Sequence, residues 1–206
     1  MAVSIAIVNL GMGNPSGVYK KLYQLGANAF LAATPDLVVK ADKIILPGVG
    51  HFEKACQKLH ELHLFDILNE MVLIKKKSVL GICLGMQIMG NESEEGKATG
   101  LGWFNTKVVR FRLTDPLRHK IPHVGWNTVD RYNRGTLLKN IDDNSEFYFL
   151  HSYHYDTLIS ESFIAKTNYE YDFISLVENG HIFATQFHPE KSHHAGSQLL
   201  KNFIEF

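Results

Sequence analysis

Residues 79–85 decide how the fold is interpreted, and they read Val79-Leu80-Gly81-Ile82-Cys83-Leu84-Gly85. The apolar run that starts at Ser78 predicts a buried strand, and the residues after the cysteine can start a helix. Glycines two positions before and after Cys83 give the Gly-x-nucleophile-x-Gly pattern of a nucleophile elbow, with cysteine as the nucleophile. Such a turn is tight and strained, so side chains at the flanking positions would clash. The stretch therefore predicts a strand–turn–helix unit that presents Cys83 as a reactive thiol.

The helix that begins after Cys83 bears on the chemistry of the sulfur. A helix N-terminus stabilises negative charge beside it, and the thiolate is the reactive form of cysteine. The backbone N–H of Leu84 can also stabilise an oxyanion. A buried core thiol is the alternative interpretation, and the two glycines oppose it. It is the interpretation we favour for the other cysteine, Cys56, which shares one helical face with Phe52, Ala55 and Leu59.

A cysteine nucleophile needs a general base, and the base needs a group that orients it. Near the end of the chain, Gln186-Phe187-His188-Pro189-Glu190 follows an apolar run. Pro189 biases His188 toward an extended conformation, in which residues two apart point to the same side. Glu190 can then fix the tautomer of His188, and the alternative is a strand end with a solvated carboxylate. Cys83, His188 and Glu190 make a candidate catalytic triad in that chain order.

Bulk composition limits the possible classes of protein. The chain has 206 residues, which suits a single domain spanning 1–206 with a substantial core. Its 21 basic and 21 acidic residues cancel, which gives no support for nucleic-acid or membrane-surface binding. No apolar stretch has the length of a membrane span, and the start of the chain lacks the basic region of a signal peptide. Two cysteines in unlike contexts do not make a disulfide framework, so we expect a cytoplasmic protein.

A metal site is the natural rival interpretation, because the chain contains 11 histidines. The closest pairs are His60 with His63, His151 with His154, and His193 with His194. None of these pairs has a partner ligand at a familiar spacing. The run Gly11–Asn14 invites a dinucleotide interpretation, but the third glycine of that motif is missing. We therefore expect neither a metal nor a cofactor.

Apolar runs alternate with helical patterns in the first part of the chain. Strands are predicted at Ile5–Val8, Ala29–Ala32, Lys43–Leu46 and directly before Cys83. Helices are predicted from a cap at Asn14 through Gln24, over 51–60 and over 64–75. This order predicts an α/β fold with a mostly parallel sheet flanked by helices, whose ligands bind at the carboxyl ends of the strands. Gly11–Gly13, Pro47–Gly50 and Cys83 fall at such ends and should converge.

From about residue 102 to 187 the pattern changes to short strands and turn residues. The predicted strands are Trp103–Arg110, Thr128–Tyr132, Phe147–Tyr153, Ile164–Thr167, Phe173–Val177 and Ile182–Gln186. They suggest a largely antiparallel second layer. The last stretch, Ala195–Phe206, is amphipathic and predicts a closing helix.

Taken together, these motifs resemble the class I (triad) glutamine amidotransferases, and more narrowly the glutaminase subunits of imidazole glycerol phosphate synthase. The resemblance spans the whole chain. It rests on Gly11–Asn14, Pro47–Phe52, Gly81–Gln87, Ser93–Gly96, Pro122–Asn127, Phe147–Tyr153 and Gln186–Ser192. It implies the class I glutamine amidotransferase fold, a central mostly parallel sheet flanked by helices, with additional antiparallel strands in the second half.

The resemblance also implies an activity, the hydrolysis of L-glutamine to glutamate and ammonia through a glutamyl thioester on Cys83. His188 would be the base, Glu190 would orient it, and the backbone amides of Val49 and Leu84 would form the oxyanion hole. The residues implied in substrate binding are Gly48, Gly50, Gln87, Glu95, His151, Ser152 and Tyr153. Without the resemblance, Gln87 would be interpreted as a solvated helix residue and Glu95 as part of an acidic loop.

In this family the ammonia passes to a (β/α)8-barrel cyclase, the partner with which the glutaminase forms a heterodimer. The resemblance places Met12, Asn14 and Trp126 at that interface, although Trp126 is equally plausible as a core residue. One departure is that Asn9 and Leu10 stand where the family usually carries an acidic residue and an aromatic.

Other functions stay open at this point. The segments 151–154 and 191–194 also resemble paralogues whose ammonia serves amidino-sugar formation in surface polysaccharide biosynthesis. A cysteine peptidase or amidase on a similar scaffold would cleave peptide bonds and leave free glutamine intact. A non-catalytic protein that only binds a partner is a third alternative, which the intact Cys83, His188 and Glu190 argue against.

Overall fold

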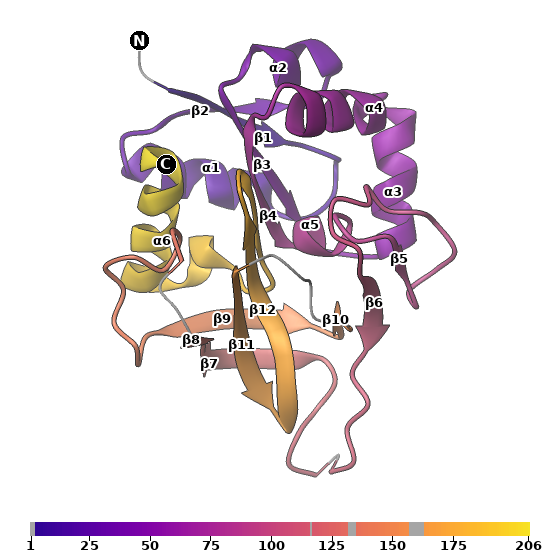
Figure 1. Ribbon diagram of the computed structural model, residues 1–206, viewed down its shortest axis with the longest axis vertical. Helices are drawn as coiled ribbons and strands as arrows, with labels where there is room; N and C mark the ends of the chain where they lie inside the picture. Colours follow the sequence, from indigo (N-terminus) through magenta and orange to yellow (C-terminus); the bar gives the residue numbers. More distant parts are fainter. Residues whose placement is uncertain (1–2, 116, 132–134, 157–162) are drawn as a thin grey trace.

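The computed structural model describes residues 3–115, 117–131, 135–156 and 163–206. A twisted eleven-stranded sheet runs through the described part of the molecule, with helices on both faces (Figure 1). Its parallel half pairs in the order β2-β1-β3-β4-β13. These strands are β1 (Ser4–Val8), β2 (Asn28–Ala32), β3 (Lys43–Gly48), β4 (Ser78–Cys83) and β13 (Ile182–Thr185). The predicted α/β fold with a mostly parallel sheet is confirmed.

The helices divide between the two faces of this sheet. They are α1 (Pro15–Gln24), α2 (Pro35–Lys40), α3 (Phe52–Glu61), α4 (Leu64–Asn69), α5 (Leu84–Gln87) and α6 (His193–Glu205), with a π-helical turn η1 (Glu70–Ile74) and a 3-10 turn η2 (Pro189–Lys191). Figure 1 shows α1 and α6 together on one side of the parallel strands, and α3 and α4 on the other. The predicted cap of α1 is present, since the Asn14 side chain accepts from Gly17 N at 2.9 Å. The helix predicted over 64–75 is α4 followed by the π turn η1.

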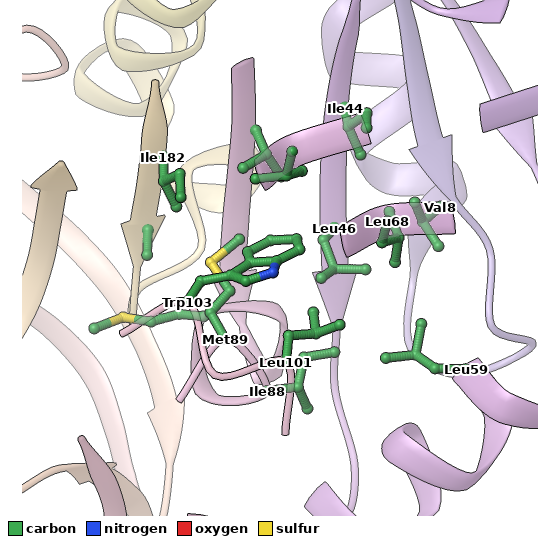
Figure 2. Packing of buried hydrophobic residues seen from close by; sticks show 14 of the residues in the cluster. Val8, Ile44, Leu46, Leu59, Leu68, Ile88, Met89, Leu101, Trp103 and Ile182 are labelled. Carbon is green, nitrogen blue, oxygen red and sulfur yellow. The ribbon is translucent and has the colours of Figure 1, made fainter. Parts of the chain in front are cut away.

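Two apolar cores explain why the strands are hydrophobic on both faces. Along β1, Ala6 and Val8 face the core under α2, α3 and α4, whereas Ile5 and Ile7 face the core under α1 and α6. Figure 2 shows the first core, with Trp103 and Met89 in the middle, Ile182 on one side and Leu46 and Val8 on the other. The indole N–H of Trp103 donates to Asn69 Oδ1 at 2.7 Å. Because that polar atom is satisfied, the large ring can be buried at low cost.

The predicted antiparallel strands of the second half are confirmed, but most of them extend the same sheet and do not form a second layer. Antiparallel pairing carries the sheet from β13 through β12 (Tyr171–Asn179) and β10 (Tyr153–Tyr155) to β6 (Lys107–Arg110), where β5 (Glu92–Ser93) adds in parallel. The strand β11 (Phe163–Tyr169) forms a hairpin with β12 and pairs with β8 (Asp130–Arg131). Alternation indicates a half-buried strand, but it does not indicate which neighbour the strand pairs with.

A separate antiparallel pair, β7 (His123–Thr128) with β9 (Glu146–His151), lies beside the main sheet. The sequence analysis missed β7, and its strand over Thr128–Tyr132 reaches residue 132, which lies outside the described residues. The strand predicted over Phe147–Tyr153 is two strands, because the chain leaves the β7–β9 pair at His151 and joins the main sheet at Tyr153. This crossover brings residues 151–153 to the carboxyl end of β4.

No helix among the described residues is both long and apolar enough to span a bilayer.

Candidate active site

Cys83 lies at the end of β4 in a strained turn. Its backbone has φ 55° and ψ −109°, a conformation that non-glycine residues seldom adopt. The turn is closed by glycines: a Cβ on Gly85 would overlap the carbonyl oxygen of Leu46, and one on Gly81 would lie 2.9 Å from Gly85 O. The predicted strand–turn–helix is therefore present, with Leu84 as the first residue of α5. Strain of this kind is tolerated where the surrounding structure enforces it, and such sites are commonly functional.

His188 and Glu190 come together next to this turn. The chain passes from β13, the neighbour of β4, through His188 into the 3-10 turn η2, and His188 Nδ1 lies 2.9 Å from Glu190 Oε1. Both side chains are almost completely buried. The sequence argument expected an extended chain to align them. Only His188 is extended, and Glu190 reaches it through the turn.

Charge couples His188 to Cys83. Burial acts to lower the pKa of His188, but negative charge on Cys83 and then the contact with Glu190 outweigh it and raise the pKa to about 10. Among the described residues, His188 Nε2 has no well-aligned hydrogen-bond partner, so we attribute the coupling with Cys83 mainly to charge. The thiol instead points at Leu150 O, 3.7 Å away. The raised pKa favours a protonated His188 beside the sulfur, and loose geometry is common in active sites without substrate.

A cavity of about 340 Å³ opens over Cys83. Its lining includes most of the predicted oxyanion and substrate residues: Val49, Gly50, Leu84, Gln87, Glu95, His151, Ser152 and Tyr153. Gly48 lies one layer behind, packed on Leu84 and Gly85. The volume suits a small polar ligand.

Two lining side chains differ from the solvated groups that their local sequence suggested. Gln87 is 95% buried and its Nε2 donates to Tyr153 O at 3.0 Å and to Gln186 Oε1 at 3.1 Å. Both hydrogens are thus used, and the side chain has only its carbonyl oxygen to offer a ligand. Glu95 accepts from Phe52 N at 2.8 Å, which holds its carboxylate at the rim. An amide oxygen and a carboxylate together favour a ligand with an ammonium group.

The predicted interface residues lie on two surface segments. Trp126 on β7 is 41% exposed and stacks on His193 with ring centroids 4.7 Å apart, so it is not a core residue. Met12 and Asn14 lie in the loop before α1, and Asn14 also caps that helix. This loop touches the residues just after β3, since a Cβ on Gly13 would lie 2.8 Å from Val49 N.

A cluster of neutral histidines backs the cavity. His151 Nε2 lies 3.2 Å from His123 Nδ1, and the rings of His151, His123 and His154 pack around Phe111. Burial lowers the pKa of His123 to about 4 and holds the pKa of His151 well below its ordinary value. Burial also lowers the pKa of His154. Within the described residues, no three His, Cys, Asp or Glu side chains gather as metal ligands would.

The sequence analysis missed two groups at the sulfur. Gln186 is fully buried, and its Nε2 lies 3.6 Å from Cys83 Sγ. A polar residue at the end of the apolar run 182–185 was the available signal. The carbonyl of Leu150 left no signal, because its position depends on the pairing of β7 with β9. Cys56 is buried in α3 as expected, and burial raises the pKa of its thiol to about 12.

The family model described as "Glutamine amidotransferase class-I" matches residues 7–206. Among curated relatives, the chain is 44% identical over 201 residues to "Imidazole glycerol phosphate synthase subunit HisH 2" of Methanococcus maripaludis, covering 98% of both chains. It is also 44% identical over 201 residues to "Imidazole glycerol phosphate synthase subunit HisH 1" of Campylobacter jejuni, covering 97% of this chain and 98% of the relative.

Solved structures show the same fold at low sequence identity. A structure described as PurLQS from Thermotoga maritima aligns with a TM-score of 0.73 at 16% identity, over 100% of this chain and 99% of that one. A structure described as a glutamine amidotransferase aligns with a TM-score of 0.74 at 18% identity, over 98% and 97% of the two chains.

Proposed function

This chain belongs to the class-I glutamine amidotransferases, and from that premise we propose that it is the glutaminase subunit of an imidazole glycerol phosphate synthase. It hydrolyses L-glutamine to glutamate and ammonia and passes the ammonia to a partner subunit in histidine biosynthesis. One observation carries the catalytic part of the proposal. A cysteine held at φ 55° lies beside a histidine that Glu190 holds at 2.9 Å, under a cavity of about 340 Å³.

The proposed reaction uses Cys83, His188 and Glu190 as a triad. The Cys83 thiolate attacks the side-chain amide carbon of glutamine, and the proton held by His188 passes to the departing ammonia. Water, deprotonated by His188, then cleaves the glutamyl thioester and releases glutamate. Glu190 keeps Nδ1 of His188 protonated and so leaves Nε2 to exchange the proton. The cytoplasm keeps free thiols such as Cys83 reduced, so we propose that the enzyme works there.

The tetrahedral intermediate carries a negative charge on its oxygen, and this oxygen needs hydrogen-bond donors close to Cys83. We assign this role to the backbone amides of Leu84 and Val49, because both residues line the cavity beside Cys83. Leu84 N is the first amide of α5 and is free of intrahelical bonding. Gly48 and Gly50 flank Val49 and let its peptide approach the substrate.

The amino-acid end of glutamine is assigned to the opposite wall. The Gln87 carbonyl oxygen and the Glu95 carboxylate bind the ammonium group, and the backbone of residues 151–153 binds the carboxylate. This assignment follows from the acceptors that remain free on Gln87 and Glu95. It makes the cavity selective for a free amino acid over a peptide, which distinguishes the glutaminase from a peptidase.

The partner is proposed to be a (β/α)8-barrel cyclase that docks over Met12, Asn14 and Trp126 and activates the glutaminase. The support is mechanical: Gly13 packs on the amide of Val49, and Met12 packs on Gly50. A partner that moves this loop therefore also moves the Val49 peptide, and losing one oxyanion donor costs about a hundredfold in rate. A paralogue that supplies a sugar amidination reaction shares the glutaminase site, and the HisH names of the full-length relatives favour the histidine pathway.

The test compares glutamate release by the chain alone, with the cyclase, and with the cyclase plus its nucleotide ligand. We expect low turnover alone and a rise of a hundredfold or more with the liganded partner. No glutamate release in any of the three would overturn the glutaminase assignment. Equal release in all three would overturn the activation step and leave the triad standing.

A further inference from the structure

Two buried glutamine side chains form a hydrogen-bonded chain that ends on the Cys83 sulfur. Tyr153 O accepts from Gln87 Nε2 at 3.0 Å, Gln186 Oε1 accepts from the same Nε2 at 3.1 Å, and Gln186 Nε2 donates to Cys83 Sγ at 3.6 Å. Gln186 is 0% exposed and Gln87 is 5% exposed. Because both side chains are buried, water does not compete for these hydrogen bonds, and the direction of each one affects the energy of the site.

The direction of this chain follows from its anchor, even though the oxygen and nitrogen of an amide have nearly the same shape. A backbone carbonyl can only accept, so the Gln87 atom beside Tyr153 O has to be the NH2 group. The second hydrogen of that NH2 group meets Gln186, which must therefore present its oxygen. The NH2 group of Gln186 is left facing the sulfur. The same Tyr153 carbonyl also lies 2.8 Å from His151 Nδ1, which makes it an acceptor for two networks.

A hydrogen-bond donor beside the sulfur stabilises the thiolate more than the thiol. A thiol needs an acceptor, which Leu150 O supplies at 3.7 Å, whereas a thiolate can only accept. When the proton leaves, the contact with Leu150 O is lost, and the contact with Gln186 becomes charge-assisted and stronger. Unlike His188, the amide keeps its hydrogens in every step of the cycle.

We propose that Gln186 stabilises the Cys83 thiolate and positions it for attack, and that Gln87 sets the orientation of the Gln186 amide. The proposal rests on the proposed role of Cys83 as the nucleophile. It gives Gln87 a second task beside its proposed contact with substrate, and it gives Gln186 a role that the Cys-His-Glu pattern does not include. The ionisable groups facing the sulfur are His188 with Glu190 behind it, His151 from β9 and Glu95 across the cavity.

The test measures alkylation of Cys83 by iodoacetamide as a function of pH, without glutamine, with the labelled residue identified by mass spectrometry. Gln186→Met keeps the size of the side chain and removes the donor, and Gln186→Glu replaces the donor by an acceptor. We expect the pH of half-maximal alkylation to rise by about one unit in Gln186→Met, which is a tenfold slower alkylation at pH values well below the midpoint, and by more in Gln186→Glu. The rate at high pH, where the thiol is fully ionised, should change little.

Two further variants complete the design. Gln87→Met frees the Gln186 amide to rotate and should shift the profile in the same direction by less. Gln198→Met removes another amide hydrogen bond, the one to Asn202 in α6, and should leave the profile unchanged. An unchanged profile in Gln87→Met and in every Gln186 variant that folds overturns the proposal. Because no glutamine is present, a wild-type chain that alkylates normally but fails to hydrolyse glutamine would sink the proposed function and leave this inference intact.

Discussion

Lowering the pH from 6.5 to 5 should destabilise the protein through its buried histidines. His123 has a pKa of about 4 in the folded chain, because burial disfavours its charged form, against about 6.5 when unfolded. Between these two values the unfolded state binds one proton more than the folded state. Stability supplied by the neutral His123 is therefore present above pH 6.5 and is lost as the pH falls toward 4.

The loss of unfolding free energy follows from the pH range between these two pKa values. Each group of this kind removes about 1.4 kcal/mol of unfolding free energy per pH unit, so His123 alone removes about 2 kcal/mol between pH 6.5 and 5. His151 and His154 have lowered pKa values and act with the same sign. His188 adds no slope here, because its raised pKa leaves it protonated in both states below pH 6.5. The raised pKa of the buried Glu178 opposes the trend only toward the acid end.

The assay is urea unfolding followed by circular dichroism at pH 7.5, 6.5 and 5. The matched variant is His123→Asn, whose side-chain amide can replace the His123 Nδ1 contact to His151 and does not titrate. We expect the variant to lose about 2 kcal/mol less than wild type between pH 6.5 and 5. His60→Asn, on the exposed face of α3, should keep the wild-type slope. An undiminished slope in His123→Asn would refute the reasoning.

Three further outcomes are expected. Cys83→Ala should abolish glutamine hydrolysis while keeping the wild-type urea midpoint, whereas Cys56→Ala should stay active and lose about 1 kcal/mol of stability; the two assays on both variants decide it. Gly85→Ala should cost about 3 kcal/mol or more, because its Cβ overlaps Leu46 O, against about 1 kcal/mol for Gly180→Ala, which has φ +60° but open space; similar urea midpoints would contradict this. Glu190→Gln should lower kcat about a hundredfold and move the pH profile of turnover downward, since the carboxylate raises the pKa of the base; steady-state kinetics across pH measures both.

The parallel half of the fold was predictable because local signals agree there. The runs that became β1, β2, β3 and β4 are apolar on both faces, and Asn14 and Pro15 mark the start of α1. Residues 35–40 were missed, because six residues are too few to show a helical period.

The second half was harder because strand pairing is not a local property. β7 was missed, since its apolar residues Val124 and Trp126 are exposed whereas its buried residue is the polar His123, which inverts the expected pattern. The strand predicted over 147–153 was split by a change of sheet that no residue within it signals. Tertiary pairing, not propensity, decided both cases.

The triad was identified from local patterns, and its catalytic roles stay predictions. Cys83 was marked by its glycines, and His188 by its proline and Glu190. The contacts that other parts of the chain make with the sulfur were not predictable from local patterns. Gln186 contacts a residue 103 positions away, and the carbonyl of Leu150 contacts one 67 positions away.

The placement of β13 has a consequence for the order in which the molecule is completed. This late strand lies between β4 and β12, so it joins the parallel half of the sheet to the antiparallel half. During synthesis, β4 therefore has an open edge until residues 182–185 emerge. Val79, Leu80 and Ile82 on β4 are all buried in the finished sheet, and a newly made chain exposes them along a free edge of the kind that aggregates. His188 follows this strand three residues after its last residue, Thr185, so a chain interrupted before β13 holds the proposed nucleophile without its proposed base. The emergence of residues 182–188 thus completes both the joining of the two halves of the sheet and the proposed catalytic triad.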